Sequence, residues 1–478
     1  MERFKALFSN GAQQTAIYAS AIVVGKLIAV VMLPVFTFFL TPEEYAKLDI
    51  IQTLANLVSV VIGFGLADTL FRFAGENTQP RQKREIAAGV FGLALLASAL
   101  SLLITQLLAP TIAYHLPGDV SIVQTRIILA SLSLTGCILV PLSWLRMQNK
   151  APFYFFATVS RAFAQALLVL LFLYFGYGVT GVLIAGLLCA SSLTIFMSIH
   201  QWQQTGIKLS MSILKKQGRY GGVLVIAGMA AFLLSCFDRW ILASYFDMVT
   251  VAQYALACKI GIMAALLTEP YRMWWNPRRF SVLYGENGPE KCAKQTEYGL
   301  LIALFSAIIV SAMGALVVKY LSPEPYHGAL IYVPYLAGIA ALNASINLLN
   351  TSVLSEEKTS MPIWINGSAA LLACVGFFIL IPAYSVWGAI GTICCAQLFR
   401  ICLYYKIGQS IIIIPYRMRQ IGLLSLTTAF TILVIAQADT PTESLLWGGL
   451  GCFLLLIIAI VGGTLPTPKN LFIHLSRI

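Results

Sequence analysis

The chain has 478 residues, of which 59% are hydrophobic and only 10% are charged, and its mean hydropathy is +0.84. Soluble domains are about 45–50% apolar and about 25% charged, so this composition excludes a soluble protein. The net charge of +12 is compatible with nucleic-acid binding, but the basic residues lie between apolar segments rather than in one patch. We therefore predict no nucleic-acid partner.

Apolar segments long enough to cross a membrane recur along the whole chain. A span needs about 20 residues, because the hydrocarbon core is about 30 Å thick and a helix rises about 1.5 Å per residue. By this criterion we predict an all-α polytopic membrane protein with about 14 transmembrane helices. In chain order the predicted spans are residues 11–40, 45–73, 86–109, 121–145, 152–175, 179–200, 221–246, 251–270, 296–320, 326–354, 362–381, 386–405, 421–436 and 443–463.

The basic residues predict the topology. Of the 31 Lys and Arg residues, most are counted with the loops and span ends on one side, Arg400 included, and only Lys47 and Lys319 are counted with the other side. Cytoplasmic loops carry an excess of Lys and Arg, so we predict that both termini are cytoplasmic. The remaining five basic residues fall within spans: Lys26, Arg126, Arg161, Arg239 and Lys259.

Four of these five cations lie deep in apolar sequence. The fifth, Arg126, is near the outer end of its span. Each Lys or Arg at a helix centre costs roughly 3 kcal/mol, so four without neutralisation would cost on the order of 12 kcal/mol. Asp238 is the one clear acidic neighbour at comparable depth. The spans are therefore biased towards positive charge, which indicates a cavity that receives an anion.

Structural roles compete with this interpretation. Lysines can snorkel towards the interface, but Lys26 and Lys259 lie near mid-span, where snorkelling is hardest, so cavity lining is favoured for them. Arg161 either lines the cavity or pairs within its own half of the chain. Asp238 is predicted to orient Arg239, with ion coupling as the alternative.

Asp68 and Arg72 are four residues apart near the inner end of the second span. This is the spacing of a local helix pair, and contact with a lipid headgroup is the alternative. No Ser/His/Asp set, paired carboxylates, GxxxxGK[ST] loop or zinc-type cysteine spacing is present. We therefore predict no catalytic residues, no metal and no cofactor, and a protein that is not an enzyme.

An internal repeat can be read at a shift of about 208 residues, or six spans, although apolar sequences also align by chance. Because six is an even number, both halves would insert in the same orientation, as parallel repeats with a site between them. Lys26 and the pair Asp238-Arg239 would then occupy corresponding faces. The matching landmarks are Tyr45-Ala46 with Tyr254-Ala255, Arg72-Phe73 with Arg279-Phe280, and Gly181 with Gly388.

The repeat predicts three parts of the chain. Residues 1–205 would form an N-terminal lobe of six spans, and residues 206–410 would form a C-terminal lobe of six spans. Residues 411–478 would supply two further spans and a cytoplasmic tail.

Short motifs follow one another in a recognisable order over residues 1 to about 407. They are Leu33-Pro34, residues 40–45, 63–66 and 71–73, Asp238-Arg239, Tyr254-Ala255, Lys259, residues 356–359, Asn366, Ile381-Pro382 and residues 387–389. Their order and spacing resemble the polysaccharide flippases, the oligosaccharide-lipid branch of the MOP (multidrug/oligosaccharidyl-lipid/polysaccharide) superfamily. The resemblance implies two six-helix lobes forming a V-shaped central cavity, two C-terminal helices and alternating access.

The resemblance also implies a cargo of polyprenyl-pyrophosphate-linked sugar, such as an O-antigen or another surface polysaccharide repeat unit of lipopolysaccharide biosynthesis. Buried cations would suit its pyrophosphate, because Arg binds phosphate oxygens bidentately and Lys acts as a point charge. We expect flipping from the cytoplasmic to the periplasmic leaflet of a bacterial inner membrane, with membrane lipids and polysaccharide polymerase or assembly proteins as partners. The alternatives are a lipid-linked-sugar polymerase, ligase or glycosyltransferase, and a multidrug or cation exporter of the same superfamily.

Overall fold

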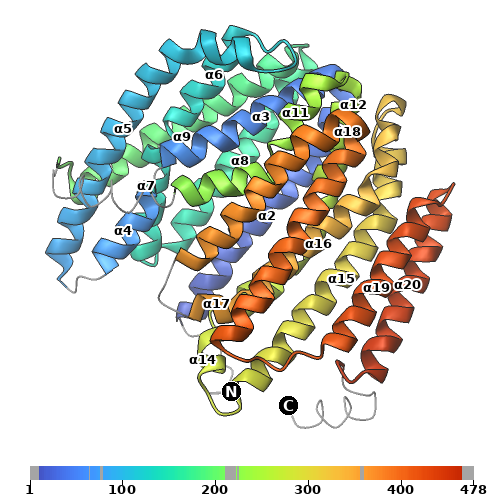
Figure 1. Cartoon of the computed structure of the whole chain (residues 1–478). Helices are drawn as coiled ribbons and strands as arrows, with labels where there is room; N and C mark the ends of the chain where they lie inside the picture. Colours follow the sequence, from blue (N-terminus) through green and yellow to red (C-terminus); the bar gives the residue numbers. More distant parts are fainter. Residues whose placement is uncertain are drawn as a thin grey trace. The chain divides into compact units, whose positions relative to one another are not determined.

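The computed structural model describes residues 10–63, 65–75, 79–209, 222, 225–355 and 360–465. Over these ranges the chain is helical almost throughout and contains no strand (Figure 1), so the predicted all-α fold is confirmed. The motif residue Phe64, the motif at residues 356–359 and the predicted cytoplasmic tail beyond Leu465 lie outside the described residues.

Twelve helices in the described ranges are long and apolar enough to cross a membrane. A bent pair, Val225–Ser235 followed by α11 (Asp238–Tyr245), turns by 45° and is a thirteenth candidate span. One of the twelve contains almost all of α18 (Ser360–Ile411), which has 52 residues. A straight helix of that length would measure about 78 Å, more than twice the thickness of the hydrocarbon core.

The α18 segment is in fact a hairpin of two spans. Ser385 has non-helical backbone angles, φ 52° and ψ −134°. A Cβ placed on Gly376 would lie 2.6 Å from Thr392 Cγ2, and one placed on Gly388 would lie 2.1 Å from Leu380 O. In a straight helix Gly376 and Thr392 would be about 24 Å apart. The chain therefore folds back at Ser385, and each of the fourteen predicted spans has a helical counterpart.

We expect Gly388→Ala to disrupt this hairpin, because the added methyl group would collide with the Leu380 backbone, which cannot rotate away as a side chain can. Overpacking of this kind costs about 1–3 kcal/mol. The measurement is the melting temperature of purified protein. Gly391→Ala is the matched control, because nothing lies within 4 Å of a Cβ at Gly391. Equal melting temperatures for the two variants would contradict the tight turn.

Contacts divide the chain into two units, Met1–Phe232 and Leu233–Ile478. In the first unit α2 packs along α8, α5 packs on α6 and α7, and α9 lies against α6, α7 and α8. Leu70, Phe91 and Val140 form a buried core where α4, α5 and α7 meet. The helices are α2 (Asn10–Phe39), α3 (Pro42–Gly63), α4 (Leu66–Gly75), α5 (Pro80–His115), α6 (Ile122–Ser133), α7 (Thr135–Met147), α8 (Ala151–Tyr174) and α9 (Gly178–Thr205).

In the second unit α15 is the central helix, packed against α13, α16, α19 and α20 (Figure 1). Small residues, Ala303 and Ala307 on α15 and Ala341 and Ala344 on α16, allow these helices to approach closely. The predicted boundaries at residues 205 and 410 stay predictions. The elements after α11 are α12 (Met248–Gly261), α13 (Met263–Trp275), α14 (Arg279–Leu283), α15 (Gly288–Leu321), η1 (Glu324–Ile331), α16 (Val333–Leu349), α17 (Thr351–Ser355), α18, α19 (Met418–Ala436) and α20 (Pro441–Val461).

Candidate functional site

The two deep cations of the first unit lie on neighbouring helices at the same depth. Lys26 is on α2 and Arg161 is on α8, and both are half-buried. Gln14 Oε1 accepts a hydrogen bond from the Ala151 N–H (3.0 Å), and the Tyr18 ring meets the Tyr154 ring at 5.2 Å. The two residues in contact are 137 positions apart in the first case and 136 in the second, so the two helices run in the same direction. Continuing that offset puts Arg161 within one turn of the level of Lys26.

Arg161 has a buried polar atom, Nε, with no hydrogen-bond partner in the described part of the chain. A buried donor of this kind is costly unless a ligand or water satisfies it. Together with Lys26 it gives the first unit two half-buried cationic groups within about one helical turn of the same level.

The remaining predicted residues of the first unit are exposed. Asp68 and Arg72 lie in the first and last turns of α4. Arg126 lies on α6, and its backbone oxygen accepts a hydrogen bond from Gln106 Nε2 (3.0 Å). The headgroup contact considered for Arg72 and Asp68 stays a prediction.

In the second unit the structure brings Asp238 and Arg239 together with Tyr254 of α12. Asp238 Oδ1 lies 3.6 Å from Arg239 Nη1, and the side chains are 2% and 13% exposed. The Tyr254 hydroxyl donates to Asp238 Oδ2, and the Arg239 guanidinium lies 6.0 Å from the Tyr254 ring centroid. The carboxylate and the aromatic ring thus both bear on the orientation of the guanidinium.

Lys259 lies in the last turn of α12, five residues beyond Tyr254, and is half-buried. Asp247 caps the start of this helix by accepting hydrogen bonds from Thr250 Oγ1 (2.7 Å) and Thr250 N (3.2 Å). The hydrogen bond from the Thr250 side chain is the main reason that the pKa of Asp247 is below its usual value. This cap holds the start of the helix that carries Tyr254 and Lys259.

The count of basic residues placed Arg400 with the loops, and that assignment was wrong. Arg400 is inside the second arm of α18, which continues to Ile411. Its Nε donates to Asn366 Oδ1 (3.0 Å), and its Nη1 donates to Asn343 Oδ1 (3.3 Å) and Gln397 Oε1 (2.7 Å). The partners belong to α16 and to both arms of α18, which are distant in sequence, so no local sequence pattern signals this cluster.

The second unit also contains an apolar pocket of about 360 Å³ between α15, α16, α18 and α19. Its lining includes Leu304, Ile339, Ile390 and Ile432. An apolar lining of this kind suits a hydrocarbon chain rather than a charged group.

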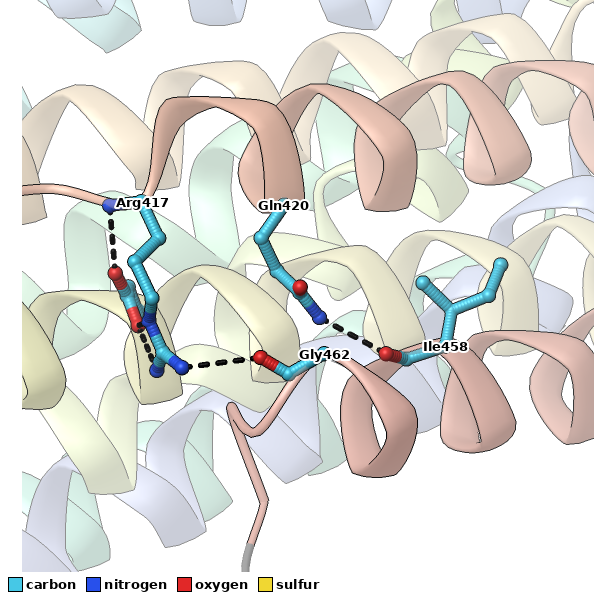
Figure 2. A network of polar contacts seen from close by, with 5 residues as sticks. Arg417, Gln420, Ile458 and Gly462 are labelled. Carbon is cyan, nitrogen blue, oxygen red and sulfur yellow. Dashed lines mark hydrogen bonds and ion pairs between the residues drawn. The ribbon is translucent and has the colours of Figure 1, made fainter.

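A second charged cluster holds α19 and α20 against α15. Glu297 of α15 is 3% exposed at its side chain, and it accepts hydrogen bonds from Arg417 N (3.0 Å), Nε (3.0 Å) and Nη2 (2.5 Å). Figure 2 shows that Arg417 Nη1 also reaches the Gly462 carbonyl oxygen (3.1 Å), and that Gln420 Nε2 donates to Ile458 O (2.8 Å). We call Glu297, Arg417, Gln420, Ile458 and Gly462 the clasp.

Solved structures of transporters share this fold. The structure titled lipid II flippase MurJ, inward closed conformation, has a TM-score of 0.72 and 11% identity, over 93% of this chain and 98% of that chain. A ligand complex of the MATE multidrug transporter DinF-BH has a TM-score of 0.62 and 14% identity, over 84% and 95% of the two chains. An inward-facing multidrug resistance MATE transporter of the MOP superfamily has a TM-score of 0.60 and 16% identity, over 86% and 99%. At these identities the likeness shows the fold.

No curated protein matches the chain. The profile described as polysaccharide biosynthesis protein matches residues 12–278. The predicted resemblance agrees with both comparisons: the profile is of a polysaccharide biosynthesis family, and the fold is that of structures titled as a lipid II flippase and as a transporter of the MOP superfamily. The structures that share the fold are titled as a flippase and as multidrug transporters, which agrees with the prediction that the chain is not an enzyme. Since the profile covers more than half of the sequence, the chain belongs to the polysaccharide biosynthesis protein family.

Proposed function

We propose that the chain flips a polyprenyl-pyrophosphate-linked oligosaccharide, an O-antigen or other surface polysaccharide repeat unit, from the cytoplasmic to the periplasmic leaflet of a bacterial inner membrane. It does so by alternating access, with both of its termini in the cytoplasm. The membrane lipids are its surroundings, and polysaccharide polymerase or assembly proteins receive the product.

The observation that carries this proposal is the set of cations inside apolar spans. Lys26 and Arg161 lie at one depth in the first unit, and Arg239 and Lys259 lie on neighbouring helices of the second. A diphosphate headgroup offsets the cost of burying such charges, whereas a cationic drug would increase it. In this proposal these four residues bind the headgroup, and Asp238 orients Arg239.

The apolar pocket of the second unit supports a lipid-linked cargo, because its lining suits an isoprenoid chain. The exposed side chains of Arg72 and Asp68 on α4 would make the first contact with the headgroup. Family membership supports a role in polysaccharide biosynthesis.

Deleting the gene in its host tests the proposal. We expect surface polysaccharide to disappear and the lipid-linked repeat unit to accumulate in the inner leaflet, because the polar headgroup cannot cross the bilayer unaided. Extracted lipid-linked sugar and surface polysaccharide are both measured, and the intact gene on a plasmid should restore both. Normal surface polysaccharide in the deletion strain would refute the proposal.

A cation exporter is the competing function, because the MATE multidrug transporters have the same fold. It predicts the opposite phenotype: the deletion strain becomes sensitive to cationic drugs while its surface polysaccharide stays normal. Measuring the growth inhibition by such drugs in the same two strains separates the two functions.

A further inference from the structure

Arg400 is a half-buried cation whose hydrogen-bond partners are all neutral. The three side chains that accept from its guanidinium, Asn343, Asn366 and Gln397, are amides. Asn366 in turn donates to the Tyr404 hydroxyl (3.3 Å) through its Nδ2. Amide oxygens satisfy the geometry of a guanidinium but leave its full positive charge uncompensated.

Two other arginines of this unit, Arg239 and Arg272, lie beside a carboxylate instead. Arg239 lies 3.6 Å from the Asp238 carboxylate, and Arg272 lies 2.8 Å from the carboxylate of Glu269, three residues earlier. Arg400 has no carboxylate within ion-pair distance among the residues that the structure describes. Its charge therefore requires another source of compensation.

The position of Arg400 makes that requirement stronger. Counted from the turn at Ser385, Arg400 lies about 22 Å along the second arm of α18, inside the thickness of the hydrocarbon core. A solitary charge at that depth is costly unless a counter-ion reaches it. The cost favours an anionic occupant over water alone.

One guanidinium nitrogen remains available to such an occupant. Nε and Nη1 are used by the amides, whereas Nη2 makes no hydrogen bond within the described chain and retains accessible surface. Because the amides fix the guanidinium from one side, Nη2 is held in place for a ligand at little further cost in side-chain entropy.

We propose that Arg400, held by Asn343, Asn366 and Gln397, is a binding site for a phosphate oxyanion of a membrane lipid. The lipid-linked diphosphate of the proposed function and an ordinary anionic phospholipid share this chemistry. The inference rests on the proposed function only for the first of these two sources. The Arg400 charge attracts the phosphate, and Nη2 donates to one of its oxygens.

Binding of farnesyl diphosphate to the purified full-length protein tests this site, with farnesol as the uncharged control. We expect Arg400→Gln to bind about tenfold to a hundredfold more weakly than the wild type, because a charge-assisted hydrogen bond is lost. Arg400→Lys, which keeps the charge, should lie between the two. Arg126→Gln, on the exposed face of α6, should bind as the wild type does. The melting temperature of each unliganded variant is recorded alongside.

The second arm repeats the titration in nanodiscs of phosphatidylcholine and of phosphatidylglycerol. Weaker farnesyl diphosphate binding in phosphatidylglycerol alone would identify ordinary phospholipid as an occupant of Arg400, and equal binding in both would identify the diphosphate. Wild-type affinity in Arg400→Gln, or no binding by the wild type, overturns the site. If Arg400→Gln does not fold, wild-type affinity in Arg400→Lys overturns it.

Surface polysaccharide in cells separates this inference from the proposed function. If the chain is required for export and Arg400→Gln exports and binds normally, the site is refuted and the function stands. If binding depends on Arg400 but the deletion strain exports normally, the site stands and the proposed function is refuted.

Discussion

Replacing Lys26, Arg239 and Lys259 together with glutamine should abolish surface polysaccharide, even when export is expressed per amount of protein in the membrane. Each replacement removes a positive charge from an apolar span, and a charge-assisted hydrogen bond to a phosphate contributes about 1.5–3 kcal/mol. Each single replacement should therefore slow export about tenfold to a hundredfold. Export is measured as labelled polysaccharide reaching the cell surface, normalised to the amount of protein.

The controls separate charge from stability. Arg239→Gln alone leaves the buried Asp238 carboxylate without its neighbour at 3.6 Å, which is destabilising in itself. The double variant Asp238→Asn/Arg239→Gln restores the charge balance, so it should be abundant and still slow. Arg126→Gln, exposed near the predicted outer interface, should export normally. Full export by the triple variant would rule out electrostatic capture of the headgroup.

Arg417→Ala should be the most destabilising single change at the clasp. It leaves Glu297, whose side chain is 3% exposed, as a charge that has lost the two guanidinium donors Nε and Nη2 and keeps only the backbone N–H of residue 417. Breaking a fully buried pair costs about 3–5 kcal/mol, and we expect about 2–4 kcal/mol here because the Arg417 side chain is 42% exposed. The measurement is the melting temperature of purified protein, and the separation of α19–α20 from α15 can be followed by cross-linking.

A double-mutant cycle isolates the pair itself. Glu297→Gln/Arg417→Gln removes both charges and should be more stable than Arg417→Gln alone, since no buried charge is left unpaired. Arg419→Ala is the matched control on the same helix, because Arg419 is exposed. Additive effects of the two single changes would mean that the ion pair contributes nothing to the attachment of α19 and α20.

Hydropathy predicted the spans because a membrane helix must satisfy its backbone internally and present apolar side chains over a fixed length. It also placed two spans within α18, one on each side of the turn at Ser385. Gly388 was noted only as a landmark of the repeat and of the family motifs, and Gly376 was not singled out, although both let the two arms pack this closely. Their role depends on which atoms they meet across the hairpin, which no local pattern encodes.

The candidate site was predicted less completely. Asp238 and Arg239 are adjacent in sequence, so their pairing could be foreseen, whereas the contribution of Tyr254 requires the packing of α11 on α12. Arg400 was assigned to a loop because it is only five residues from the end of its predicted span. Its amide partners, at positions 343 and 366, come from other segments. Topology rules count charges by sequence position and do not register such long-range partners.

The clasp also sets an order of events in time. Glu297 is made 120 residues before Arg417, and at about 5–20 residues per second its carboxylate waits roughly 6–24 s for its partner. The Gly462 carbonyl, which completes the clasp, is made later still. During synthesis α15 must therefore remain where water can hydrate the Glu297 carboxylate. Its final burial is a late step of membrane insertion that α19 and α20 bring about together.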